Sequence, residues 1–286
     1  MVQRIFHLQA LSALHVGTGQ GVGVVDLPIA RAKATNLPIV PGSAIKGILR
    51  DEVGLSKEDT RTLFGPESSD NENAHAGAVA FGDAHLLILP IRSFAGTVAY
   101  ATSPFILRQY KRDLSLPFTI PSYDGNALLT ETTVLKVTAD QIALEDLDLN
   151  STTNEEVQQW AETIASQLYP ESVADYQIWR EEFIKRFVIL PDDHFSFLAD
   201  TATEVRIRIK IERETRIVKD GALWSEENLP AESVLWGVVG VNKARDKSGR
   251  SAEDLSKLLP AGESHLQIGG KHTVGRGLTR FILNQA

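Results

Sequence analysis

The sequence predicts an α+β fold built around an antiparallel sheet. Short segments in which apolar and polar side chains alternate occur near both ends of the chain, and longer segments with helical spacing lie between them. A period of two is typical of a strand with one buried face, and a period near 3.6 is typical of a helix. Because strands and helices come in separate runs instead of strict alternation, the α+β class is favoured over α/β.

The first two-thirds of the chain are expected to contain a strand at the start and then a series of helices and strands. Residues 4–16 predict a half-buried strand, because Phe6 and Leu8 alternate with His7 and Gln9. A glycine-rich loop follows this strand. The elements expected next are a helix over 44–53, a short helix and polar loop within 55–75, strands over 78–81, 85–91 and 92–100, and helices over 103–114, 154–168 and 173–187.

The last third contains the strongest strand pattern. Residues 204–218 alternate between β-branched and basic side chains, which predicts a long strand with a basic outer face. A turn at Asp220-Gly221 and the apolar segment 233–241 suggest a returning partner. A helix over 252–259 and strands over 265–270 and 279–283 complete the chain. This order fits the ferredoxin-like class, which includes RNA-recognition folds.

Composition limits the function. The 286 residues are 43% hydrophobic, which is enough for a buried core and fits one large domain with insertions or two small domains. The chain has no cysteine for disulfides or thiolate metal sites. No apolar run is long enough for a membrane helix, and the first residues lack the layout of a signal peptide. We therefore expect a cytoplasmic protein with no membrane partner.

The net charge of −8 argues against a protein that coats itself in nucleic acid. The acidic residues are unevenly placed, however, since residues 138–171 contain no lysine or arginine. RNA binding needs local positive charge and backbone N–H groups instead of a positive total. Cations lie near glycines and turns at both ends of the chain, namely Arg31, Lys33, Lys46, Arg50, Lys271, Arg276 and Arg280.

A C-terminal loop contains four glycines and two cations within nine residues. Such a loop can bring its backbone close to a ligand, and its N–H groups can form an anion-binding concavity. A tight turn would need one glycine, so phosphate binding is the favoured interpretation. The chain has no G-x-x-x-x-G-K-[ST] motif, which argues against a P-loop enzyme. It also has no complete dinucleotide fingerprint, which argues against a Rossmann enzyme. The predicted RNA-binding residues here are Gly269, Gly270, Lys271, His272, Thr273, Gly275, Arg276 and Gly277.

The helix over 44–53 has Ser43 as its expected N-cap. Lys46 and Arg50 are four residues apart, so they share one face near the helix start and could meet a phosphate there. An ordinary helix with a solvated basic face explains the same pattern equally well.

Two sets of residues are candidates for acid–base or metal chemistry. His15 and Asp26 flank the first glycine-rich loop, and a carboxylate there can hold a metal ion or orient a hydroxyl. Taken by itself, Asp26 is better explained as a loop residue that caps backbone N–H groups. Glu226 and Glu227 are possible accessory acids, although paired acids are usually just solvated.

Four stretches together resemble a known family. LHVGTGQGVGVVDLPIARAKATNLPIVPGSAIKGILRDE is similar to the signature of RAMP-type CRISPR proteins, in particular the repeated backbone subunit of type III-B (Cmr) effector complexes. LLILPIRSFAGTVAYATSPFILRQYKRD, EENLPAESVLWGVV and IGGKHTVGRGLTRF are similar to the same family. Two departures are Ser43-Ala44, where Ser-Ser is more usual, and Asn228, where some relatives place an aromatic residue.

The resemblance implies a single domain over 1–286, shaped like a right hand. The palm would come from both chain ends, helical fingers would be inserted over 55–75 and 138–200, and a β-hairpin thumb would span 204–240. Copies would stack into a helical filament along the guide crRNA, together with other CRISPR effector subunits.

The resemblance also implies an activity. Each thumb would displace one nucleotide, and complementary target RNA would be cut beside it by its own 2′-hydroxyl with Mg²⁺ or Mn²⁺. Asp26 matches the family's catalytic, metal-binding aspartate, His15 resembles a family histidine near it, and Lys46 matches the lysine that binds guide phosphates. Three alternatives stay open: a non-catalytic RNA-binding scaffold, a guide-processing endoribonuclease and, more distantly, a small-molecule enzyme.

Overall fold

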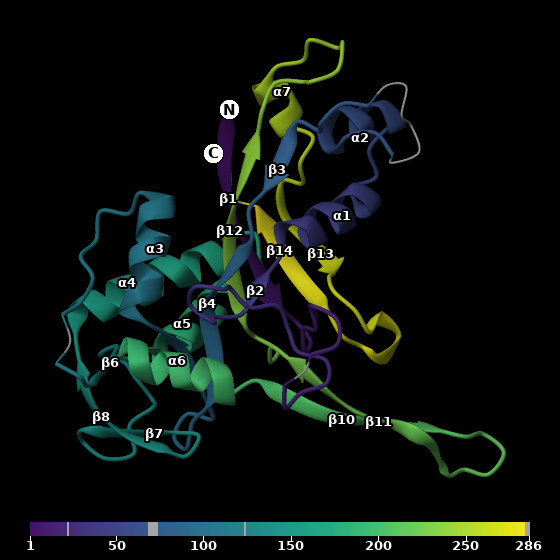
Figure 1. Cartoon of the computed structure of the whole chain (residues 1–286). Coiled ribbons are helices and arrows are strands. Elements are labelled where there is room, and N and C mark those ends of the chain that lie inside the picture. Colours follow the sequence, from purple (N-terminus) through teal and green to yellow (C-terminus); the bar gives the residue numbers. More distant parts are fainter. Residues whose placement is uncertain (22, 68–73, 123, 284–286) are drawn as a thin grey trace.

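The computed structural model of the protein describes residues 1–21, 23–67, 74–122 and 124–283. Within them, twelve strands form one large and mostly antiparallel sheet, and two more form a separate ribbon that projects from it (Figure 1). The predicted α+β fold with an antiparallel sheet is confirmed. The strand order is β13-β14-β1-β12-β4-β5-β9-β6-β8-β7, with β2 beside β4 and β3 beside β12. The sheet strands are β1 (Val2–Ala10), β2 (Ile39–Val40), β3 (Val79–Phe81), β4 (Ala84–Arg92), β5 (Val98–Thr102), β6 (Ala127–Leu129), β7 (Gln141–Leu144), β8 (Leu147–Thr153), β9 (Phe187–Ile189), β12 (Val234–Val241), β13 (Gly262–Gln267) and β14 (Leu278–Leu283).

The helices cover both faces of this sheet. α1 packs against β3 and β13, α3 packs against β4, and α4 contacts β1, β6 and β9. Among the described residues, no helix has both the length and the apolar character needed to cross a bilayer. The helices are α1 (Gly42–Glu52), α2 (Lys57–Phe64), α3 (Pro104–Leu114), α4 (Glu155–Leu168), α5 (Tyr176–Arg186), α6 (Asp192–Thr201) and α7 (Ala252–Ser256), with a 3₁₀ turn, η1 (His272–Val274).

The first strand lies between β12 and β14, so both ends of the chain build one half of the sheet. The strand predicted over 4–16 ends at Ala10. The prediction that it is half-buried is wrong, because His7 and Gln9 are as buried as Phe6 and Leu8 on the other face. Helices cover the polar face too, and a polar side chain at a buried position needs a hydrogen-bond partner.

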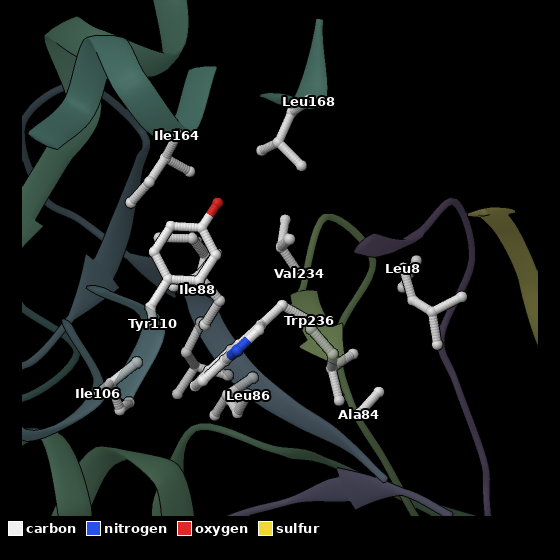
Figure 2. Close-up of a cluster of buried hydrophobic side chains, with 14 of the residues drawn as sticks. Leu8, Ala84, Leu86, Ile88, Ile106, Tyr110, Ile164, Leu168, Val234 and Trp236 are labelled. Atoms are coloured by element: carbon white, nitrogen blue, oxygen red, sulfur yellow. The ribbon is translucent and has the colours of Figure 1, made fainter. Parts of the chain in front are cut away.

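Those partners come from α3 and from the end of α4. His7 Nε2 lies 2.8 Å from Tyr110 Oη, and Gln9 Nε2 donates to Tyr169 Oη at 3.2 Å. Figure 2 shows Tyr110 beside Trp236 in the cluster of apolar side chains between β4, β12 and these helices. The two aromatic rings meet edge to face, with centroids 5.5 Å apart. This cluster is the core that joins the two halves of the sheet.

The segment 138–200 was expected to form helical fingers. It contains the expected helices, α4 and α5. The same segment supplies β7, β8, β9 and α6, and its strands extend the sheet beyond β5. The short apolar run of β9 is fully buried and contacts α4, so it lacks the alternation that identifies a surface strand. In the other expected insertion, over 55–75, α2 is present, and residues 68–73 lie outside the described residues.

The ribbon consists of β10 (Glu204–Ile211) and β11 (Val218–Asn228). Its pairing joins Glu204 to Asn228, and the turn between the strands covers 212–217. The predicted turn at Asp220-Gly221 and the predicted thumb boundary at 240 are therefore wrong. The segment 233–241 forms β12, which lies in the sheet between β1 and β4.

The N-cap of α1 also differs from the prediction. The cap residue is Pro41 and not Ser43, and no side chain of the cap residue bonds to the helix. Asp83 from the β3–β4 turn takes this role, since its Oδ1 accepts from Gly42 N at 2.9 Å. A carboxylate at this end also interacts favourably with the helix dipole.

Burial of His7 predicts a dependence of stability on pH. Burial lowers the pKa of His7 from 6.5 to about 4, so the folded protein binds fewer protons than the unfolded chain between these values. The free energy of unfolding is then expected to fall by roughly 3 kcal/mol as the pH falls from 7 to 4. Urea unfolding of wild type and His7→Gln across this range measures the difference. The same change at the exposed His265 should leave the wild-type slope in place, and an equal slope in His7→Gln would contradict the prediction.

Candidate functional site

The loop after β1 extends to the base of the ribbon and lies along β11. Leu27 N donates to Ser225 O at 3.1 Å, and Glu227 N donates to Leu27 O at 3.0 Å. These two bonds flank a parallel bridge between Leu27 and Glu226. The loop thereby pairs with β11 at one residue, and this pairing fixes the backbone next to Asp26.

The carboxylate of Asp26 is held by one residue of β11. Ser225 N and Ser225 Oγ both donate to Asp26 Oδ2 at 2.8 Å, and Asp26 N donates to Ser225 Oγ at 3.0 Å. These hydrogen bonds from Ser225 hold the pKa of Asp26 below its usual range. The side chain is exposed, and Oδ1 makes no hydrogen bond within the described part of the chain. Asp26 is thus an ionised carboxylate with one oxygen available to a ligand.

His15 bonds to the same strand, β11, but makes no direct contact with Asp26 in the described residues. Its Nδ1 donates to Glu227 O at 2.7 Å, and its ring is 6% exposed. Glu227 is two residues from Ser225, so the two anchor points are about 7 Å apart along β11. Gly17 leaves room for the ring, because a Cβ at that position would lie 2.8 Å from His15 Nε2. His15 is therefore placed to hold β11 in position close to Asp26.

The glycine-rich loop over 269–277 is bonded to the segment that follows β1. Gly270 N donates to His15 O at 2.9 Å, and Gly277 N donates to Ala13 O at 3.1 Å. Gly269 and Gly277 have positive φ angles of 88° and 80°, and a Cβ at either would lie within about 2.2 Å of a backbone oxygen. These two glycines are thus required for close approach to the protein's own backbone, and the RNA-binding role expected of the four glycines stays a prediction. Gly270 and Gly275 face no such obstacle.

The polar residues of this loop differ in what they contact. Lys271 Nζ lies 3.1 Å from Glu226 Oε1, and His272 Nε2 lies 2.7 Å from Gly269 O. Thr273 is exposed. Arg276 is 7% exposed, and its buried Nε has no hydrogen-bond partner among the described residues. A buried guanidinium group with an unsatisfied donor is costly, which makes Arg276 the loop cation best suited to receive an anion.

Glu226 joins the glycine-rich loop to the ribbon. The residue is 1% exposed, and Oε1 accepts from Trp224 Nε1 at 2.7 Å as well as from Lys271. Arg208 Nε from β10 lies 4.0 Å from Oε2. Burial acts to raise the pKa of Glu226, but the bonds from Trp224 and Lys271 outweigh it and the pKa is lowered. This acid is an internal ionic contact and is not open to RNA.

Glu227 faces the opposite side of β11 and is also engaged. Its Oε1 lies 2.6 Å from Arg31 and 3.1 Å from Thr203 Oγ1, and its Oε2 accepts from Ile29 N at 3.1 Å. Arg31 also pairs with Asp200 at the end of α6, at 3.0 Å. This buried network connects the loop after β1 to the base of the ribbon. The contacts of Glu227 are therefore those of a residue that stabilises the fold.

Lys46 and Arg50 share a face of α1, as predicted. Lys46 Nζ donates to Val79 O at 3.2 Å, and burial together with the charge of Arg50 lowers the pKa of Lys46. Arg50 lines a cavity between α1 and α2 and donates to Pro66 O at 3.5 Å. Because α1 packs on β13 and the glycine-rich loop follows β13, both elements border the same edge of the sheet.

Comparison with known proteins gives the family. The sequence model of the RAMP superfamily matches residues 7–280. The chain belongs to the RAMP superfamily. The CRISPR system Cmr endoribonuclease Cmr4 of Pyrococcus furiosus is 33% identical, over 97% of this chain and 94% of that protein. The CRISPR system CMR subunit Cmr4 of Saccharolobus solfataricus is 25% identical, over 96% of this chain and 94% of that protein. The crystal structure of oligomeric Cmr4 from Pyrococcus furiosus matches 100% of this chain and 99% of its own, with 26% identity and a TM-score of 0.76.

The RAMP fold brings most of the predicted site residues together. Asp26, His15, Glu226 and Glu227 all meet β11, and the glycine-rich loop contacts His15 and Glu226. Among the residues that the structure describes, no group of three or more histidine or acidic side chains could enclose a metal ion. Asp26 is the exposed one of the three acids at this site, since Glu226 and Glu227 are buried.

Sequence reasoning missed the residues that hold these side chains in place. Ser225, Arg31, Arg208 and Trp224 each contact a predicted residue, and none was singled out for that role. Ser225 lies 199 positions from Asp26, so no spacing rule links the two. Ser225 lies in the polar segment VKDGALWSEEN, so its own side chain gave no signal of this role.

Proposed function

We propose that this chain is a repeated backbone subunit of a type III-B CRISPR ribonucleoprotein that binds guide RNA and cleaves complementary target RNA. Near-full-length similarity to two Cmr4 proteins, one of them named an endoribonuclease, supports the proposal. The observation on which it rests is Asp26, an exposed and ionised carboxylate with one oxygen available. A cleavage assay on the assembled complex, comparing wild type with Asp26→Ala, tests it.

The reaction we propose is attack by an RNA 2′-hydroxyl on the adjacent phosphorus. A P–O2′ bond forms and the P–O5′ bond breaks, so the 2′-hydroxyl loses a proton and the departing 5′-oxygen gains one. Such an attack needs the two oxygens in line with phosphorus, and a nucleotide displaced from its stack can reach that geometry. Asp26 Oδ1 would either bind a divalent ion or accept the hydrogen bond of the attacking hydroxyl, while Ser225 holds Oδ2.

A divalent ion, Mg²⁺ or Mn²⁺, suits this arrangement. Mg²⁺ in phosphate chemistry commonly binds one or two carboxylates and fills its other positions with water and phosphate oxygens. The available Oδ1 of Asp26 fits this pattern, whereas Glu226 and Glu227 are already engaged. When bound, the ion would offset the negative charge that develops on the phosphate.

Guide RNA would follow the edge of the sheet at β13. Arg276 offers one phosphate contact, and Lys46 and Arg50 on α1 offer another. Because base pairing reads the sequence, these contacts need to recognise only the RNA backbone. The acidic surface elsewhere would face other subunits, in a complex that we place in the cytoplasm.

Self-association has its own support on the ribbon. The apolar side chains of β10 are exposed, and β10 pairs with β11 in a ribbon apart from the large sheet. An apolar stripe of this kind marks a surface that is covered in an assembly. The related Cmr4 of Pyrococcus furiosus is described as oligomeric, which agrees with copies that stack along RNA. The stripe consists of Val205, Ile207, Ile209 and Ile211, exposed by 53%, 73%, 47% and 53%.

Lys46→Ala is expected to weaken guide binding by a few-fold to about ten-fold and to reduce the slope of log affinity against log salt by about one. The reason is that one phosphate contact is lost per subunit. Guide-binding titrations at several salt concentrations measure both quantities. Lys257→Ala, which removes an exposed lysine beside α7, is the control. Wild-type affinity and slope in Lys46→Ala would refute the assigned role.

Two other functions remain as competitors. If this chain is only a scaffold subunit, it would bind guide RNA normally. The assembled complex would then cut target RNA at the same rate with or without Asp26. A guide-processing endoribonuclease would act alone, so isolated protein incubated with precursor repeat RNA would cleave it.

A further inference from the structure

We propose that Ser225 is a positioning residue for Asp26 and that it ties the acid to the ribbon. The inference rests on the proposed function of Asp26. It concerns a residue of β11 that is distant in sequence and contacts Asp26 through three hydrogen bonds.

The hydroxyl of Ser225 has two roles at once. It donates to Asp26 Oδ2 at 2.8 Å and accepts from Asp26 N at 3.0 Å, so it joins the backbone and the carboxylate of the same residue. The backbone N–H of Ser225 supplies a second donor to Oδ2 at 2.8 Å. Together these bonds use one carboxylate oxygen and leave Oδ1 for the substrate. Alanine can perform neither role of the hydroxyl, whereas threonine can perform both.

The backbone extends this link. Leu27 bonds to β11 on both sides of Glu226, and β11 pairs with β10 along the ribbon. The segment that contains Asp26 is thus part of the ribbon's hydrogen-bonded base. A displacement of β11 must either move Asp26 with it or break three bonds to Ser225. RNA that binds the exposed ribbon and displaces β11 would thereby change the position of Asp26.

The test compares Ser225→Ala and Ser225→Thr in the assembled complex. Loss of one hydrogen bond to a charged group should reduce the single-turnover cleavage rate of Ser225→Ala about ten-fold. Target affinity should stay within about two-fold of wild type, because the hydroxyl is not an RNA contact in this proposal. Threonine keeps the hydroxyl and suits a strand, so Ser225→Thr should recover most of the rate. Ser196→Ala, at an exposed serine on α6, should cleave like wild type.

A second measurement does not depend on cleavage. In the isolated protein, amide hydrogen exchange at Asp26 and Leu27 should be about ten-fold faster in Ser225→Ala and unchanged in Ser225→Thr, with β10 unaffected. Wild-type exchange in Ser225→Ala would overturn the inference. So would normal cleavage by Ser225→Ala, or equal losses in the alanine and threonine variants, when Asp26→Ala is inactive. If Asp26→Ala itself cuts normally, the proposed function fails, and the exchange measurement still decides whether Ser225 positions Asp26.

Discussion

Asp26→Ala is expected to reduce target cleavage by the assembled complex at least about 10²- to 10³-fold, the range seen when a positioned polar group is removed from a reacting centre. The change removes the available oxygen at Oδ1 and the charge that would attract a metal ion. Guide binding and assembly should be unchanged, because the side chain is exposed and bonds only to Ser225 within the described residues. Single-turnover assays with saturating target measure the rate, and guide-binding titrations and sedimentation measure the rest.

Two further variants make this result specific. Asp26→Asn keeps the size of the side chain and removes its charge, so it should be nearly as slow as alanine if charge is what matters. Asp220→Ala removes an exposed acid from β11 without touching the loop after β1, and it should cut at the wild-type rate. Normal cleavage by Asp26→Ala would assign the cutting to another subunit and leave this chain as a scaffold.

The predicted fold was right where local pattern decides structure and wrong where partners had to be chosen. Alternation identified β10, but its partner was taken to be 233–241 instead of 218–228. The segment 233–241 is a nearly continuous apolar run. It contains β12, which is largely buried, as expected of a central strand. A ribbon strand exposed on both faces needs no such run. Continuous burial, recognised in VLWGVVGV, could have placed this strand in the sheet.

The candidate site shows the same limit. Motif similarity identified Asp26, but the contact with Ser225 joins segments that only the folded sheet brings together. For Glu226 and Glu227, the sequence alone could have excluded a shared role in cutting. Neighbouring residues of a strand point to opposite faces, so the two acids could not both reach one cutting site. In the structure, Glu226 contacts Lys271 and Glu227 contacts Arg31, on opposite sides of β11.

The largest effect on stability is expected from Glu227→Gln. Arg31 and Glu227 form a buried pair, with side chains 17% and 8% exposed. Removing one charge leaves the other desolvated, which costs about 3 kcal/mol at the low end of the range for buried pairs, because Arg31 keeps its contact with Asp200. Urea unfolding of the isolated protein measures this loss. Glu204→Gln breaks the more exposed pair with Arg206 and should change stability by less than about 1 kcal/mol.

The same variant separates a structural role for Glu227 from a catalytic one. Arg31 and Glu227 tie the loop that contains Asp26 to β11, so loss of this ion pair should loosen the loop and slow cleavage together with the loss of stability. Arg31→Met combined with Glu227→Met removes both charges and should recover part of the unfolding free energy, because no unpaired charge remains buried. If Glu227→Gln instead abolishes cleavage while unfolding like wild type, Glu227 acts on the RNA directly, and the buried pair with Arg31 opens when the substrate binds.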